Sequence, residues 1–176
     1  MTAINFKEVQ RFKTWWAWLP IIALNILFMY AIIQQVFFGK PFGTKPAPDY
    51  ILLIIEFLLL LLLIFLLSIK LHTSINDTGI YYRFYPFQFK QTAIEWHELR
   101  DVYIREYNSF YEYGGRGIRY GSAKVGRAIN TSASCNKGLQ LQFNNGELLL
   151  IGTTKPIELQ TIVDKVITSG KINRAI

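Results

Sequence analysis

The sequence predicts a two-helix transmembrane hairpin followed by a mainly-β domain that ends in a helix. Before residue 70, two long apolar stretches flank a short loop rich in proline and glycine. After residue 70, aromatic and β-branched residues alternate with polar residues, and glycine and asparagine recur, a pattern typical of antiparallel strands. Charged residues make up only 18% of the chain, against about 25% in soluble proteins. The composition therefore fits an integral membrane protein.

The most apolar segment is residues 50–69, which we predict to be the second transmembrane helix. Its run ILLIIEFLLLLLLIFLLSI has nineteen residues and one charged side chain, Glu56. A helix of that length is about 28 Å long, close to the roughly 30 Å of a bilayer's hydrocarbon core. A helix buried in a soluble protein would carry more polar residues on part of its circumference.

The first transmembrane helix is predicted at residues 15–38, after an N-terminal segment at residues 1–14. Three tryptophans at its start, Trp15, Trp16 and Trp18, are typical of the aromatic belt at a membrane interface. Residues 39–49 contain three prolines and two glycines, so they form a connector without regular structure. The two helices are therefore antiparallel, and both chain ends lie on one side of the membrane.

The distribution of cations predicts which side that is. Four cations flank the helices on the side of the chain ends and two lie in the connector: Lys7, Arg11, Lys13 and Lys70 against Lys40 and Lys45. Cytoplasmic loops carry the excess of lysine and arginine, so we expect cytoplasmic termini, a cytoplasmic β-domain and an external connector.

Residues 70–170 are predicted to form the β-domain, with residues 171–176 as a tail. The clearest hairpin is GLQLQF-NNG-ELLLIG, in which apolar and polar residues alternate up to an Asn-Gly turn. The last segment changes to a helical period. We expect Thr154 to cap this helix and Ile157, Ile162, Val166 and Ile167 to form its apolar side, which covers an end of the sheets.

Several stretches of the β-domain resemble bacterial membrane-anchored pleckstrin-homology-like (PH-like) domains: GIYYRFYPF, AIEWHELRDVYIREY, GGRGIRY and GLQLQFNNGELLLIGTTKPIELQTIV. The resemblance covers roughly Leu71 to Val166. It implies a seven-stranded antiparallel sandwich or partly open barrel of two near-orthogonal sheets, closed at one end by the C-terminal helix. It also implies a location in the bacterial inner membrane. Eukaryotic lipid-binding relatives use cations around the first loop between strands, but the corresponding loop here, residues 76–79, has none.

The glycine-rich segment from Gly114 to Gly126 and its border contain a group of cations with no acidic residue among them: Arg116, Arg119, Lys124 and Arg127. Each cation near an anionic membrane surface contributes about 1 kcal/mol to binding. We therefore predict that this group binds anionic lipid headgroups or an acidic protein partner. The alternative is a solvated loop without a ligand.

Glu56 is the second candidate for a functional site, because ionisable side chains within membrane spans are rare and mark functional positions. Its depth matches that of Gln34 and Gln35 on the antiparallel first helix, and Asn25 is a further polar residue there. Three interpretations remain open. Glu56 hydrogen-bonds a glutamine and fixes the hairpin register, contacts a partner protein's helices, or belongs to a proton pathway.

No sequence motif indicates catalysis, a metal or a cofactor, so we expect a protein that is not an enzyme. His72 and His97 have no serine and acid arranged around them, and Cys135 is the only cysteine. The net charge of +7 and the pI near 9.5 suit a nucleic-acid binder as well, but the spans favour a membrane surface, and no nucleotide loop is present. We expect an interaction module that binds a protein partner, a second copy or anionic lipid. The alternative is an accessory subunit of a membrane transporter or assembly.

Overall fold

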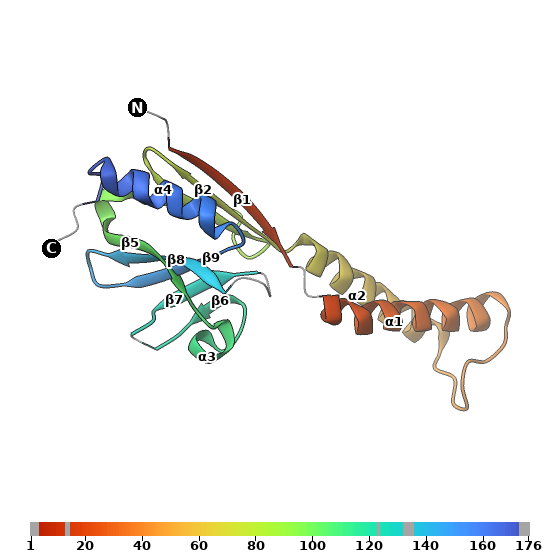
Figure 1. Cartoon of the computed structure of the whole chain (residues 1–176). Coiled ribbons are helices and arrows are strands. Elements are labelled where there is room, and N and C mark those ends of the chain that lie inside the picture. The colour runs from red at the N-terminus through yellow and green to blue at the C-terminus, as the bar shows by residue number, and fades with distance from the viewer. Residues whose placement is uncertain (1–3, 13–14, 123, 132–135, 173–176) are drawn as a thin grey trace. The chain divides into compact units, whose positions relative to one another are not determined.

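The structure is a computed structural model that describes residues 4–12, 15–122, 124–131 and 136–172. The chain divides into two compact units, residues 14–68 and residues 1–13 together with 69–176 (Figure 1). We call the first unit the helical hairpin and the second the β-domain. The side chains of Trp15 and Trp16, predicted as interfacial anchors, lie outside the described residues, as does Cys135.

The helical hairpin consists of α1 (Trp15–Ile32), which continues as a π-helix (η1, Ile33–Phe37), and α2 (Asp49–Ser68). The predicted pair of apolar helices is confirmed. Ala31, Ile32 and Leu52 form the small buried cluster between them. The segments Trp18–Phe37 and Asp49–Ser68 are long and apolar enough to cross a membrane.

Most apolar side chains of the hairpin are on its surface rather than between its helices. Ile26, Phe57 and Ile64 are 65%, 61% and 62% exposed. Exposed apolar area costs about 25 cal/mol per Å² in water, so exposure of these side chains to water is unfavourable.

The β-domain contains two sheets (Figure 1). The first sheet has the antiparallel order β1-β2-β3-β4 and consists of β1 (Asn5–Arg11), β2 (Lys70–Asn76), β3 (Gly79–Tyr85) and β4 (Thr92–Glu95). The second has the order β5-β8-β9-β7-β6 and consists of β5 (Leu99–Glu106), β6 (Gly117–Tyr120), β7 (Arg127–Asn130), β8 (Lys137–Phe143) and β9 (Leu148–Thr153). The pair β7 and β9 is parallel, and the other pairs of this sheet are antiparallel.

Three short or terminal helices complete the β-domain: a 3-10 turn (η2, Trp96–Glu98), α3 (Ser109–Tyr113) and α4 (Pro156–Thr168). The C-terminal helix α4 packs against β1, β5 and β8. Its buried side chains are Leu159, Ile162, Val163 and Val166. They join the inward side chains of both sheets, such as Leu71, Ile80 and Leu141, in one core. The two sheets and the terminal helix are therefore as predicted.

The predicted number of seven strands is wrong, because the described residues form nine. The two additional strands are β1 and β7. In β7, Ala128, Ile129 and Asn130 are all buried, so the strand has no alternation that would have revealed it. β1 lies in the predicted N-terminal segment, before the first span.

β1 escaped prediction because its inward side chains are mostly polar. Glu8 and Gln10 are 4% and 3% exposed, whereas Val9 between them is 53% exposed. From Glu8 onward, the hydrophobic alternation of a strand is thus inverted, whereas Phe6 is buried on the inward face. Buried polar side chains need hydrogen-bond partners, and both residues have them.

Glu8 is bonded to the junction between β9 and α4. Its carboxylate accepts hydrogen bonds from Thr153 Oγ1 at 2.7 Å, from the Thr154 amide at 2.7 Å and from Thr154 Oγ1 at 2.5 Å. Gln10 donates to the Gly152 carbonyl at 2.5 Å and accepts from Thr131 Oγ1 at 3.3 Å. These bonds connect β1 in the first sheet to the second sheet and to the start of α4.

The predicted details of α4 are therefore corrected at two residues. Thr154 does not cap the helix, which begins at Pro156 with Lys155 in the N-cap position, because the Thr154 hydroxyl donates to Glu8 instead. Ile157 is 84% exposed, so it does not belong to the apolar side.

The register of β1 predicts that the β-domain folds without the helices. Arg11 pairs with Lys70, so Phe12 and Ile69 are the next residues across. Replacing residues 13–68 by Asn-Gly closes this pair with a two-residue turn. We expect a soluble protein with a cooperative melt by circular dichroism. The fragment 69–176, which lacks β1, is the comparison, and it should melt at a much lower temperature or aggregate. Equal stability of the two would contradict the role of β1.

Removal of the Glu8 carboxylate should strongly destabilise the β-domain. Glu8→Ala leaves the Thr153 and Thr154 donors without their buried acceptor, and hydrogen bonds to charged groups contribute roughly 1.5–3 kcal/mol each, so we expect a loss of about 3 kcal/mol. Urea denaturation in a neutral detergent measures it. Glu106→Ala is the matched control, because the Glu106 side chain is 73% exposed in its pair with Lys137. A similar effect of both changes would refute this account.

Candidate functional site

The predicted group of four cations is divided by the β6–β7 hairpin. Arg127 pairs with Tyr120 at the closed end of this hairpin, whereas Gly117 pairs with Asn130 at its open end. Arg116 directly precedes the open end, and the exposed Lys124 lies in the turn at the closed end. The Arg127 guanidinium donates to the Tyr82 hydroxyl at 3.0 Å. Arg116 and Arg119 are therefore the two members that share a site.

That site is a pocket of about 320 Å³ at one end of the β-domain, which we call the end pocket. Its apolar wall is made of Phe12, Ile69, Phe84, Phe87 and Ile118. Its polar side chains are Arg116, Arg119, Asn130 and Thr131. The wall thus combines the ends of β1 and β3, the residue before β2 and the edge strand β6.

The polar part of the end pocket is well defined by hydrogen bonds. Asn130 is fully buried, and its Oδ1 accepts from the Gly117 amide at 3.3 Å. Its Nδ2 has no hydrogen-bond partner among the described residues. Arg119 Nε donates to the Arg116 carbonyl at 2.9 Å, and the Arg116 guanidinium lies 5.3 Å from the centre of the Phe110 ring.

The segment that carries Arg116 is held by α3 and a network around Arg105. Arg105 donates to Glu112 at 2.7 Å, to the Tyr113 hydroxyl at 2.8 Å and to Gln140 on β8 at 2.8 Å. Burial raises the pKa of the Tyr113 phenol, which therefore stays protonated and donates to the Val125 carbonyl at 3.1 Å. The segment is thus anchored to the second sheet rather than being a free loop.

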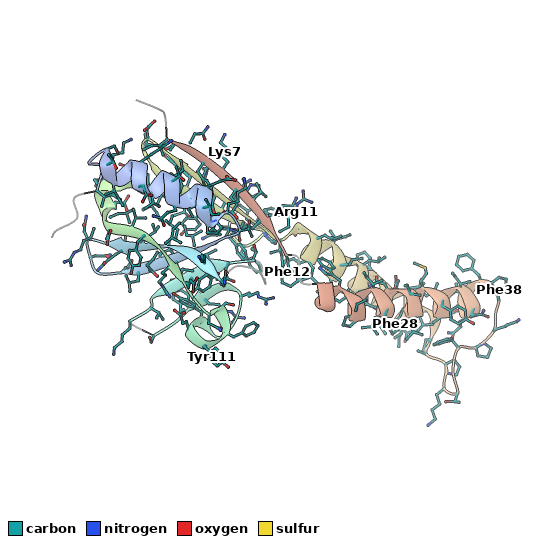
Figure 2. All side chains as sticks on the ribbon, viewed as in Figure 1. Lys7, Arg11, Phe12, Phe28, Phe38 and Tyr111 are labelled. Carbon is teal, nitrogen blue, oxygen red and sulfur yellow. The ribbon has the colours of Figure 1, made fainter. Side chains whose placement is uncertain are left out.

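Both ends of α3 are also fixed by local structure. Asn108 caps its start, because its side chain accepts hydrogen bonds from the Phe110 and Tyr111 amides. Gly114 ends the helix with a φ of 68°, a left-handed conformation that favours glycine. Tyr111, by contrast, is 92% exposed on α3 and points away from the domain (Figure 2).

A second basic surface, which the sequence analysis did not identify, lies on the outer face of the first sheet. Its members come from three neighbouring strands: Lys7 and Arg11 on β1, Lys70 and His72 on β2, and Arg83 on β3. We call these five residues the basic face. Register places His72 between Val9 and Arg83, and Arg11 beside Lys70. Figure 2 shows Lys7 and Arg11 on β1.

The electrostatics of the basic face are consistent with this clustering. The pKa of His72 is lowered by partial burial and by the nearby charges of Arg83 and Lys70. In the described part of the chain, Lys7, Arg11, Lys70 and Arg83 form no ion pair with an acidic side chain. The only acidic residue of β1, Glu8, points inward. The face therefore attracts anions.

The sequence missed the basic face because its cations are far apart along the chain. Lys70 lies 59 residues after Arg11, and Arg83 lies 13 residues after Lys70. Only the pairing of β1 with β2 brings them together. The available signal was the alternation of Lys7, Val9 and Arg11 with Glu8 and Gln10, which marks one face of a strand.

In the helical hairpin, the hydrogen bond between Glu56 and a glutamine, which was one of the three interpretations of Glu56, is not formed. Glu56 is 5% exposed, and neither carboxylate oxygen has a hydrogen-bond partner among the described residues. Gln35 instead bonds the connector, by donating to the Ala47 carbonyl and to Asp49 at 2.6 Å each. Asn25 donates to the Ile21 carbonyl of its own helix at 2.7 Å. For Gln34, the backbone carbonyl accepts from the Lys40 amide at 3.0 Å.

His97 is placed beside Glu95, with 3.2 Å between its Nδ1 and the carboxylate. Within the described residues, no group of three or more histidine, cysteine or acidic side chains is arranged to hold a metal ion.

A family described as a family of unknown function, DUF6141, matches residues 1–169. The chain belongs to this family. The DUF6141 match includes β1, both apolar helices, both sheets and α4, and so covers residues of both the helical hairpin and the β-domain. No curated protein matches the chain.

The Arg105 network predicts a rigid α3. Arg105→Ala removes charge-assisted hydrogen bonds worth about 1.5 kcal/mol or more, which corresponds to roughly tenfold faster amide exchange in residues 109–122. Hydrogen–deuterium exchange with mass spectrometry measures it. Arg100→Ala, which changes an exposed arginine on the same strand, should leave the exchange unchanged. Unchanged exchange in Arg105→Ala would show that the network does not hold α3.

Proposed function

We propose that this chain is a two-pass integral membrane protein that holds a PH-like interaction module against the cytoplasmic surface of the bacterial inner membrane. The module binds anionic lipid headgroups through its basic face. The observation that carries the proposal is the position of this face on the two strands that continue into the apolar helices. Arg11 lies four residues before the start of α1, and Lys70 two residues after the end of α2.

Chain geometry limits how far these cations lie from the spans. Consecutive Cα atoms are about 3.8 Å apart, so Lys70 lies within roughly 8 Å of the last residue of α2 and Arg11 within roughly 15 Å of the first residue of α1. Each cation near an anionic leaflet contributes about 1 kcal/mol. Because two neighbouring strands connect the β-domain to the apolar helices, rotation of the domain is more restricted than it would be with a single linker. The domain is thereby tethered with its cations near the lipid.

The PH-like assignment is supported by the order of the elements. The strands β2, β3 and β4 form one antiparallel meander, β5, β8 and β9 form another, and α4 follows the last strand. β1 adds an edge strand to the first sheet, while α3, β6 and β7 are inserted between β5 and β8. The cytoplasmic orientation is supported by the excess of cations beside the chain ends.

Amine labelling of the full chain in proteoliposomes tests the proposed contact. Lys7 and Lys70 should be labelled several-fold more slowly in vesicles containing phosphatidylglycerol than in phosphatidylcholine vesicles. High salt should remove the difference, because the Debye length falls to about 3 Å at 1 M. The exposed Lys124 and Lys165 in the same sample are the controls. Equal labelling of Lys7 and Lys70 in both lipids, or equal protection of Lys165, would refute the contact.

The second candidate is an accessory subunit of a membrane transporter or assembly, a function favoured by Glu56. Its buried carboxylate lacks a hydrogen-bond partner among the described residues, and such a group in a span is stabilised by a donor from another chain. Partner contact predicts that Glu56→Leu loses co-purifying membrane proteins while the hairpin stays folded. Lower hairpin stability with unchanged co-purification would favour a structural role.

A further inference from the structure

We propose that the end pocket binds one anionic amphiphile, whose apolar tail lies against the phenylalanine and isoleucine wall and whose anionic group is held by Arg116 and Arg119. This inference rests on the proposed placement of the domain at a membrane. It adds a defined binding site for one lipid molecule. This site is separate from the basic face, which we propose to be attracted to the bilayer surface as a whole.

The apolar wall is suited to a tail. Phe84 and Phe87 stack with their ring centres 5.3 Å apart and their planes at 10°. Phe87 is 57% exposed and Phe84 is 3% exposed, so Phe87 provides most of the aromatic surface that a tail can reach. Ile69 and Ile118 extend the wall from the two sheets. A volume of about 320 Å³ lies at the lower end of the roughly 300–1,000 Å³ of ligand pockets. Water gains few hydrogen bonds against such a wall, so an apolar tail displaces it favourably.

Asn130 is the most buried residue on the polar side of the pocket. Asn130 is 0% exposed, and its Oδ1 is used by the Gly117 amide while its Nδ2 has no partner among the described residues. The Nδ2 atom itself exposes almost no surface, so Asn130 forms part of the polar lining and does not bind the head of a ligand. The contact with an anionic head is made by the two arginines that line the same pocket.

The charge at the pocket selects an anion. Arg116 and Arg119 both line it, and no aspartate or glutamate is among its lining residues. Arginine forms paired hydrogen bonds with phosphate and carboxylate oxygens. Inorganic phosphate alone would use the arginines but leave the wall exposed to water, whereas a neutral lipid would cover the wall but add no charge-assisted hydrogen bond to the arginines. A molecule with both parts uses the whole pocket.

The chain also brings the pocket close to a source of such molecules. Ile69, in the wall, directly follows the last residue of α2, and Phe12 lies three residues before α1. At about 3.8 Å per residue, both are within roughly 12 Å of the ends of the apolar helices. In the proposed membrane, an anionic phospholipid is therefore the occupant that we assign to the pocket.

Photo-crosslinking in proteoliposomes of the full chain tests the pocket. The probe is phosphatidylglycerol with a diazirine on its acyl chain, compared with phosphatidylcholine carrying the same group. We expect adducts at Phe84, Phe87 or Ile118, several-fold more abundant with the anionic probe. Both Arg116→Gln/Arg119→Gln, which removes the anion contact, and Ile118→Trp, which fills the pocket, should reduce them at least fivefold. Lys124→Gln/Lys165→Gln is the control and should leave them unchanged.

Competition with soluble compounds shows whether the pocket recognises a whole amphiphile or only its anionic group. Dodecyl phosphate, which has an apolar tail and an anionic group, should reduce the adducts. Inorganic phosphate at the same concentration should not. Equal competition by inorganic phosphate would show that the pocket binds an anion without a tail, which would contradict the proposed amphiphile. Adducts confined to the helices, or unchanged in the two arginine substitutions while the circular dichroism melt is normal, would overturn the proposal.

Amine labelling in the same vesicles shows whether a negative result concerns the lipid site alone or also the proposed function. Protection of Lys7 and Lys70 with no adducts in the pocket would refute the lipid site alone. Loss of both signals would refute the placement of the domain at the membrane surface.

Discussion

The structure depends on one buried carboxylate. Glu8 belongs to the first strand of the chain, and its partners Thr153 and Thr154 lie where the last strand passes into the last helix. A buried carboxylate is stable only with donors in place, so the contact requires β1 in its register and α4 in its position together. Gln10 repeats the arrangement two residues later, by donating to Gly152. The first strand of the β-domain is thereby fixed to the end of β9 and the start of α4.

This closure determines how the apolar helices are attached. With β1 paired to β2, the chain leaves the domain at Phe12 and returns at Ile69, on neighbouring strands. The same pairing assembles the basic face from three strands and puts Phe12 into the wall of the end pocket. The hydrogen bonds of Glu8 and Gln10 therefore hold β1, the strand that leads into the apolar helices. They also position the basic face and the end pocket, the two surfaces that we propose to meet lipid. The proposed function follows from this geometry rather than from any catalytic group.

The fold could be predicted where one-dimensional patterns are strong. The leucine run around Glu56 indicated a long apolar helix, and the alternation around the Asn145-Gly146 turn indicated the hairpin that forms β8 and β9. β1 was missed because Glu8 and Gln10 are polar and point inward, where only tertiary contacts make them acceptable. Arg127 was grouped with Arg116 by nearness in sequence, but the β6–β7 hairpin directs it to Tyr82. Arg11, Lys70 and Arg83 meet only through strand pairing.

The central claim, that the closed β-domain lies with its basic face on the bilayer, is tested most directly by the depth of Val9. This residue is 53% exposed on that face, between the strand positions of Lys7 and Arg11. A nitroxide attached through Val9→Cys, in a Cys135→Ser background, reports its depth by power saturation in anionic proteoliposomes. The account predicts a position near the headgroups, with low access to a water-soluble nickel reagent compared with a nitroxide at the exposed Ile157. Equal access at the two positions would contradict it.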